Sequence, residues 1–187
     1  MTLQQQKQVL RKKIRAQMKQ MPDDYFRLAG QAICRRVLES QDYRQAKTIF
    51  CFVSHGKESN TYPLLERALA DGKKLCIPLC KAPGEMEAKV IRSLVDLQPG
   101  AYGIPEPPEN AETILPSEID LAVIPCLAAA QNGKRLGKGG GYYDRFLAEY
   151  TGKAVLMCPE RLLLWDIPTE SHDVQLPKVI TENAELL

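Results

Sequence analysis

The chain has 187 residues, of which 44% are hydrophobic and 26% charged, as in ordinary soluble globular proteins. A formal net charge of +2 and the lack of a long basic block argue against a nucleic-acid partner. The N-terminus lacks the apolar core of a secretory signal, and the longest apolar run, at 121–130, is too short to span a bilayer. These features predict a single domain over residues 1–187, a cytoplasmic monomer without membrane contact. The six cysteines are scattered through apolar runs, which predicts buried, reduced thiols rather than a structural metal site.

The first 40 residues predict two helices. Apolar side chains recur at helical spacing over 3–20 and again over 23–40. Between the two segments, "MPDD" places a proline and two acids where one helix ends and the next begins.

From residue 47 onward, strands and helices alternate. The expected strands cover 47–54, 74–79, 86–91, 120–125 and 153–158, and the expected helices cover 60–72 and 142–150. A proline-rich loop crosses 99–110, and the tail is a loop followed by a short strand. This order predicts an α/β fold with a mostly parallel sheet flanked by helices on both faces, a three-layer, Rossmann-like arrangement with N-terminal helices. Ligands of such sheets bind beyond the carboxyl ends of the strands.

A glycine loop occupies that place, between the strand at 120–125 and the helix at 142–150. It reads "RLGKGGGYYDRFL" over 135–147. It matches neither the P-loop nor the dinucleotide-binding pattern of glycines. Successive glycine amides can still cradle an anion, Arg135 and Lys138 supply positive charge, and Asp144 is a natural magnesium ligand beside phosphates. The loop therefore favours a nucleotide triphosphate with Mg²⁺. The alternative, a tight turn whose glycines only permit close packing, stays open.

In its order of motifs, the chain resembles the 5-formyltetrahydrofolate cyclo-ligase family. The resemblance rests on "GKRLGKGGGYYDRFL" and on its flanks: "KQVLRKKIR", "GKESNT", "YGIPEP", "IDLAVIP" and "IPTESHD". These motifs extend over most of the chain.

The resemblance implies an ATP site built from two parts of the sequence. Helical spacing alone would leave Lys7 and Arg11 on a solvated face, but the family's matching residues contact ATP phosphates. With Arg135 and Lys138 they are the expected catalytic cations. The expected ATP-binding residues are Lys7, Arg11, Arg135, Leu136, Gly137, Lys138, Gly139, Gly140, Gly141, Tyr142 and Tyr143. Asp144 and Asp173 are the expected Mg²⁺ ligands, whereas His172 and His55 are expected to be incidental.

The folate side is implied in the same way. The family's residue that matches Glu58 binds the folate, and a carboxylate suits the donor-rich edge of a pterin. Val53, just upstream, would line the same pocket and is expected to contact the substrate. Tyr102 would stack a flat ring against it, and Tyr142 would lie at the junction of nucleotide and folate. The implied partners are 5-formyltetrahydrofolate, with or without a polyglutamate tail, and ATP as co-substrate.

The implied reaction is the ATP- and Mg²⁺-dependent conversion of 5-formyltetrahydrofolate to 5,10-methenyltetrahydrofolate, with ADP and phosphate released. Two alternatives stay open: a non-catalytic relative that binds folate or nucleotide, and a sugar-phosphate isomerase or transferase of similar build. The first is motivated by a departure from the family pattern. Where members commonly read P-G-L-A-F-D, this chain reads "PCLAAA", so that Cys126, Ala129 and Ala130 replace Gly, Phe and Asp.

Overall fold

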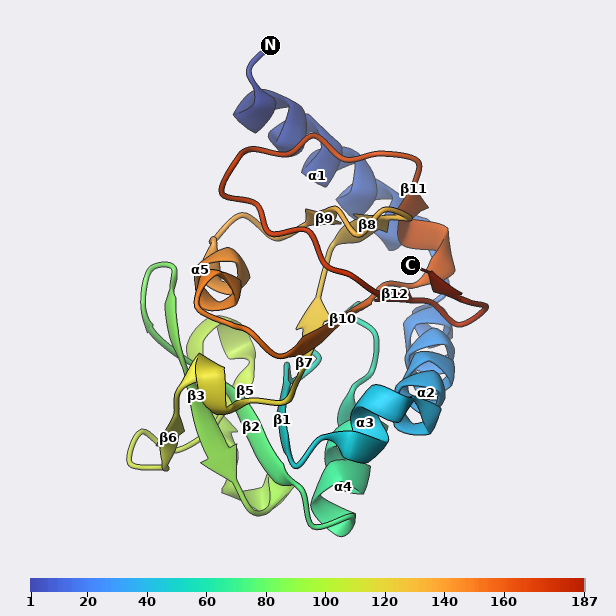
Figure 1. Ribbon diagram of the computed structural model, residues 1–187. Helices are drawn as coiled ribbons and strands as arrows, with labels where there is room; N and C mark the ends of the chain where they lie inside the picture. Colours follow the sequence, from blue (N-terminus) through green and yellow to red (C-terminus); the bar gives the residue numbers. More distant parts are fainter. Residues whose placement is uncertain (187) are drawn as a thin grey trace.

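The structure, a computed structural model, describes residues 1–186 (Figure 1). Its α-helices are α1 (Leu3–Gln20), α2 (Asp23–Glu39), α3 (Gln41–Gln45), α4 (Tyr62–Ala70) and α5 (Tyr142–Ala148). The strands are β1 (Thr48–Cys51), β2 (Lys74–Ala82), β3 (Glu85–Ile91), β4 (Gln98–Pro99), β5 (Pro105–Glu106), β6 (Thr113–Ile114), β7 (Leu121–Pro125), β8 (Ala128–Ala130), β9 (Arg135–Leu136), β10 (Lys153–Met157), β11 (Leu163–Leu164), β12 (Val179–Ile180) and β13 (Glu185–Leu186).

The main sheet has the order β13-β12-β10-β7-β1-β2-β3-β6. Neighbouring strands from β12 to β2 pair in parallel, and the outer strands β13, β3 and β6 pair antiparallel. In this order β2 lies on one side of β1 and β7 on the other. The order in which the chain adds strands to the sheet therefore reverses at β1. Ligands of open α/β sheets bind at such a reversal, beyond the carboxyl ends of the strands.

The central strands are buried on both faces. Along β7, Leu121 and Val123 pack with α2 and α4, while Ala122 and Ile124 pack with α1 and α5. This alternation follows from the two-residue period of a strand. It gives the sheet one apolar core on each side, and it confirms the predicted α/β fold with a mostly parallel sheet and N-terminal helices.

Several details go beyond the prediction. The strand expected at 86–91 is present as β3, and it forms an antiparallel hairpin with β2. Of the apolar side chains along α1, Leu3 and Val9 are exposed, whereas Ile14 is buried and Leu10 and Met18 pack partly buried against the core. Polar contacts add to this narrow apolar stripe. The two-residue strands and α3 have too few residues to show a period. Over residues 1–186, no helix is long and apolar enough to cross a membrane.

Candidate active site

One large cavity of about 1130 Å³ lies at the carboxyl ends of the parallel strands. Its floor is formed where β1 continues into Phe52 and Val53 and where β7 continues into Cys126 and Leu127. Every site residue expected from the sequence lines it: Lys7, Arg11, Val53, Glu58, Tyr102, Arg135, Leu136, Gly137, Lys138, Gly139, Gly140, Gly141, Tyr142, Tyr143, Asp144 and Asp173. The fold thus brings them together, while the role of each stays a prediction.

Helix α1 presents its cations to this cavity. The Lys7 ammonium is buried and forms ion pairs with Asp173 and, at 2.9 Å, with Glu170. Burial opposes its charge, but the hydrogen bonds to Asp173 and Glu170 outweigh burial and raise the pKa of Lys7. Arg11 donates to the Gly137 carbonyl at 2.9 Å. Two residues one helical turn apart therefore connect α1 to two separate loops.

The glycine loop needs its glycines for backbone shape. Gly139 and Gly141 have φ angles of +108° and +71°, in the region that L side chains rarely adopt. At Gly140 the reason is closeness instead, because a Cβ there would lie 2.7 Å from the Tyr142 ring. Gly141 is the N-cap of α5, so the loop turns directly into the helix that carries Tyr142 and Asp144.

Arg135 is the second buried cation of the site. Its guanidinium pairs with Asp144 at 2.5 Å, and only 4% of the Arg135 side chain is exposed. Its Nε has no hydrogen-bond partner among the described residues. Tyr143 packs beside it, with the guanidinium carbon 5.9 Å from the ring centroid, and burial raises the pKa of Tyr143. A buried guanidinium with an unused N–H is suited to holding an anionic oxygen.

The rim of the cavity joins segments that are far apart in the sequence. Lys138 forms a 2.5 Å ion pair with Glu58, whose second oxygen accepts from the His55 N–H at 2.8 Å. On the same rim, the hydroxyls of Tyr102 and Tyr142 lie 3.1 Å apart. The expected nucleotide-binding loop and the expected folate-binding residues are therefore in direct contact.

The carboxylates are suited to a hard cation, although their arrangement differs from a simple pair. Glu170, His172 and Asp173 each offer a ligand atom, and these atoms lie within 4.8 Å of one another. Asp144 accepts from the Val174 N–H at 3.3 Å, so it reaches the same loop from α5. Carboxylate oxygens are the ligands that Mg²⁺ prefers, so Glu170 and Asp173 fit that ion, whereas Asp144 lies outside this group of three.

Sequence reasoning missed Glu170 and Glu106, which also line the cavity. Glu170 had a signal in the sequence, because it is an acid three residues before the expected ligand Asp173. In the structure both carboxylates form ion pairs with Lys7. Glu106 lies in the "YGIPEP" motif, but nothing in its neighbours indicates a buried carboxylate. His172 and His55, expected to be incidental, lie on the cavity wall as well.

Of the three residues that depart from the family pattern, Cys126 lines the cavity. Ala129 and Ala130 are fully buried in β8, where Ala129 pairs with Leu163 of β11 and with Arg135 of β9. The small sheet β11-β8-β9 therefore fixes the backbone of Arg135 through its pairing with the buried Ala129. Cys126 is the departure that changes the cavity wall itself.

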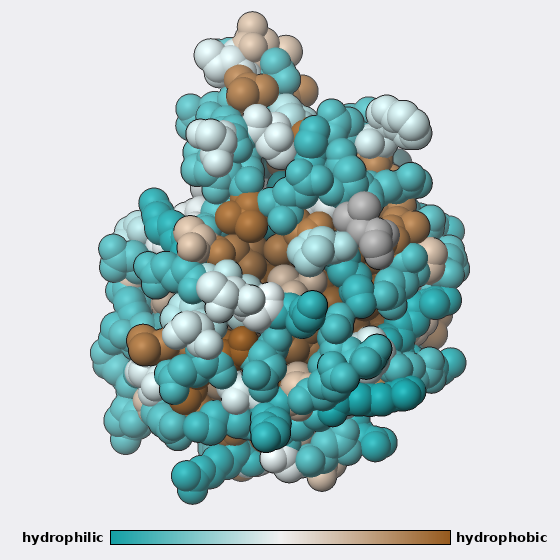
Figure 2. Space-filling view, in the orientation of Figure 1, coloured by the Kyte–Doolittle hydropathy of each residue, from teal (hydrophilic) through white to brown (hydrophobic). Residues whose placement is uncertain are grey.

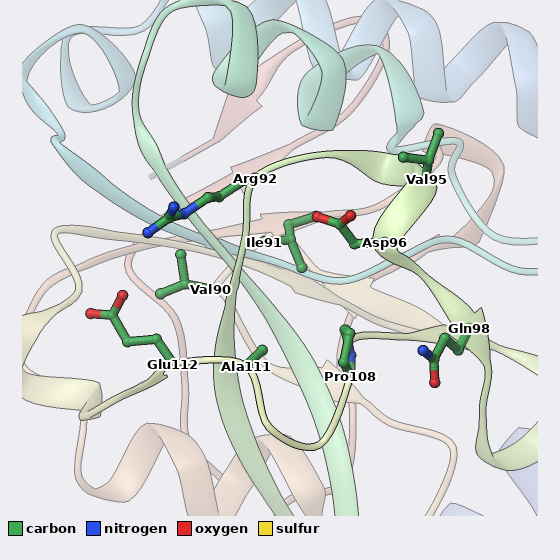
Figure 3. Close-up of a pocket in the computed structure, with 9 residues that line it drawn as sticks. All are labelled: Val90, Ile91, Arg92, Val95, Asp96, Gln98, Pro108, Ala111 and Glu112. Carbon is green, nitrogen blue, oxygen red and sulfur yellow. The ribbon is translucent and has the colours of Figure 1, made fainter.

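A second cavity lies beside the end of β3 (Figure 3). It measures about 450 Å³ and is lined by Val90, Ile91, Arg92, Val95, Asp96, Gln98, Pro108, Ala111 and Glu112. In Figure 3, Arg92 and Glu112 point outward at its rim. None of the expected site residues lines this cavity, so the large cavity is the candidate active site.

The sequence model of the 5-formyltetrahydrofolate cyclo-ligase family matches residues 3–182. The 5-formyltetrahydrofolate cyclo-ligase of Haemophilus influenzae is 30% identical over 154 residues, covering 79% of this chain and 82% of the relative. That of Escherichia coli is 30% identical over 158 residues, covering 81% and 87%. The solved structure of 5,10-methenyltetrahydrofolate synthetase from Aquifex aeolicus superposes with a TM-score of 0.86 at 25% identity, over 96% of this chain and 91% of that one.

Proposed function

The chain belongs to the 5-formyltetrahydrofolate cyclo-ligase family, and we propose that it closes 5-formyltetrahydrofolate to 5,10-methenyltetrahydrofolate at the expense of ATP. One observation carries the proposal: a single cavity gathers the four expected catalytic cations, a glycine loop, the two carboxylates expected to bind Mg²⁺ and the residues expected to hold a folate. The family match favours this reaction over the sugar-phosphate alternative.

ATP phosphates are held by Lys7, Arg11 and Arg135, with Lys138 at the rim. Arg135 is buried and keeps its Nε–H for an oxygen, and Arg11 lies against the glycine loop. Burial, together with the charge of Arg15, lowers the pKa of Arg11, yet a guanidinium stays charged at neutral pH. These groups provide positive charge where the transferring phosphoryl group carries negative charge.

The chemistry asks the protein for positioning rather than for a covalent nucleophile. The formyl oxygen of an N5-formyl amide is a poor leaving group, so it first receives the γ-phosphoryl group of ATP. N10 then attacks the activated carbon and loses its proton, and phosphate departs with the former formyl oxygen. Holding both substrates in one cavity makes the transfer effectively intramolecular. The contact between Lys138 and Glu58 lies where the two would meet.

Mg²⁺ would be held by Asp144 and Asp173 and would neutralise charge on the phosphates. Each carboxylate is already oriented by a cation of the same site, Asp144 by Arg135 and Asp173 by Lys7. Burial opposes the ionisation of Asp173, but the hydrogen bonds from Lys7 and from the Glu170 N–H lower its pKa, so the carboxylate is ionised at neutral pH.

The test is an absorbance assay for the methenyl product, with 5-formyltetrahydrofolate, Mg²⁺ and ATP. We expect the chromophore to form only with ATP, and Asp144→Asn to lower kcat by roughly 10² or more, as for loss of a group that stabilises transition-state charge. Glu149→Gln, an exposed carboxyl at the end of α5, is the matched control and should leave the rate unchanged.

A non-catalytic relative is the second candidate, because Cys126 departs from the family pattern and lines the cavity. Folded protein that binds the folate without making the chromophore would support it and would overturn the proposed reaction. Restoring glycine with Cys126→Gly would then show whether this residue is responsible.

A further inference from the structure

We propose that Glu106 is a positioning residue for the folate side of the cavity: it fixes the loop that carries Tyr102, a role that rests on the proposed function. The carboxylate is buried at the end of β5. One oxygen accepts from the Cys80 N–H of β2 at 3.1 Å, and the other from the Ala101 N–H at 3.0 Å. A single side chain therefore ties the main sheet to the base of the Tyr102 loop.

The sheet leaves a place for this carboxylate. The register of β2 with β1 extends only to Cys76, and the pairing of β2 with β3 becomes irregular after Cys80. At Cys80, which is half-buried beside the cavity, Glu106 accepts the backbone N–H that the strand pairing leaves free. Burial, and after it the hydrogen bond from the Cys80 thiol to Glu106, raises the pKa of Cys80 to about 11. The thiol thus stays protonated and faces the same carboxylate.

On its other side, Glu106 sets the start of a tight loop. A Cβ on Gly100 would overlap the Glu106 carboxylate, so the loop backbone lies directly against it. The Gly100 N–H then donates to Ile104 O at 3.0 Å, and the Ile104 N–H to Ala101 O at 3.1 Å. These bonds close the turn whose tip is Tyr102.

The tip adopts a conformation that needs support. Tyr102 has a φ of +59°, in the left-handed region that non-glycine residues rarely adopt. The residue is 73% exposed, yet its hydroxyl meets that of Tyr142 across the cavity rim at 3.1 Å. The hydrogen bond between the two hydroxyls holds the Tyr102 ring in place and raises the pKa of Tyr102. With its base held by Glu106 and its tip by Tyr142, the loop presents Tyr102 in one orientation.

The experiment measures KM for 5-formyltetrahydrofolate and for ATP in Glu106 variants of the full chain. Glu106→Ala should raise the folate KM about 10-fold, because the loop loses its anchor, and should leave the ATP KM within about 2-fold. Glu106→Gln keeps one acceptor and should give an intermediate value. Glu109→Ala is the matched control: this loop glutamate pairs with Lys81 but its side chain is 81% exposed, and it should change neither constant.

A double-mutant cycle with Tyr102→Ala separates positioning from general damage. If Glu106 acts through Tyr102, then adding Glu106→Ala or Glu106→Gln to Tyr102→Ala should change the folate KM by less than about 2-fold. Additive effects, or an equal rise in the ATP KM, would overturn the inference. The Gln series gives the answer even if the Ala variant does not fold.

Calorimetric binding of the folate distinguishes this inference from the proposed reaction. If the wild-type chain makes no methenyl product but Glu106→Gln weakens folate binding, the reaction is wrong and the positioning role stands. If the wild type turns over and the folate affinity of Glu106→Gln is unchanged, the reaction stands and the positioning role is wrong.

Discussion

Lys7 shows how a single side chain joins the two ends of the chain. It lies in the first helix, and its partners Glu170 and Asp173 follow 163 and 166 residues later. A buried ammonium without partners would be strongly unfavourable, so the two carboxylates are a condition for placing it here. The positive charge of Lys7 in turn offsets the electrostatic repulsion between the two neighbouring carboxylates. Its spacing within α1 indicates none of this.

We expect Lys7→Met to weaken both stability and ATP binding. The methionine keeps the apolar stem but removes the charge, which leaves Asp173 and Glu170 without their cation. Because both carboxylates are partly exposed, the loss of unfolding free energy should be about 1–2 kcal/mol, below that of a fully buried pair. The ATP KM should rise about 10-fold. Lys12→Met, an exposed position on the same helix, is the control for chemical denaturation and kinetics.

The same variant should reveal a pH dependence. The pKa of Asp173 is lowered below its ordinary 3.8, so its contribution to stability is present above that value and is lost as the pH falls through the lowered pKa. The pKa of Lys7 is raised above 10.5, so its contribution is present below 10.5 and is lost only at higher pH. The stability difference between wild type and Lys7→Met should be constant from about pH 5 to 9 and shrink below about pH 4. A difference that shrinks near pH 7 would contradict this assignment.

At the level of elements, α2 reaches the site through a contact of its backbone. A Cβ on Gly30 would overlap the backbone of Asn60, so helix and loop touch where glycine has no side chain. Cys34, one turn later, donates its thiol to the Asn60 carbonyl at 3.2 Å. Thr61, the N-cap residue of α4, makes no capping hydrogen bond with its side chain but donates to the Phe52 carbonyl at 2.9 Å. The loop that carries Glu58 is thereby held between α2 and the end of β1.

Gly30→Ala should therefore destabilise the protein, although alanine favours an isolated helix by about 1 kcal/mol. The methyl group must displace the Asn60 backbone, at a cost of about 1–3 kcal/mol, and Glu58 should move with it. We expect a several-fold rise in the folate KM. Gly72→Ala is the control, because it introduces strain at a φ of +70° with nothing near its Cβ and far from Glu58 in the fold. A stabilised Gly30→Ala, or equal folate KM values in both variants, would refute this role.

A feature could be predicted from the sequence where the residues that determine it are neighbours along the chain. The buried runs of β1, β7 and β10 and the loop around Gly139 carry their signals within a few residues, and they lie where expected. Periodicity identifies α2 as a helix, but it does not show that Gly30 meets Asn60, since that contact depends on packing between elements. Glu106 was missed for the same reason: its partners lie on β2 and on the preceding loop. Lys7 was found through the family resemblance and not through its spacing.

Over the whole molecule, the two faces of the sheet are held differently. On one face, α2 contributes Ile33, Cys34 and Val37 and α4 contributes Leu64, Leu65 and Ala68 to the core against the strands. On the other, α1 buries Lys7 and Ile14, packs the partly buried Leu10 and Met18 against the core, and makes polar contacts to the glycine loop and to residues 170–173. Figure 1 shows α1 projecting from the body beside the loop that follows β11. In Figure 2 the face around it is mostly hydrophilic, with hydrophobic residues gathered toward the middle.

This asymmetry predicts how ligands stabilise the protein, which hydrogen exchange can map. Segments with few buried apolar contacts open locally at low free-energy cost, so amides of α1 should exchange faster than those of α2 in the free protein. Mg²⁺ and ATP at 100 times Kd stabilise the native state by about 2.7 kcal/mol, and protection should rise first in 3–20, 137–144 and 170–174, the segments that meet around the phosphates. The folate should instead protect 53–58 and 98–106. If ATP slowed exchange in α4 as much as in α1, or protected 98–106 without folate, the cavity would not be divided in this way. If each ligand protects its own segments, and the two together protect the contact between Lys138 and Glu58 most, then both substrates meet where the rim already joins them.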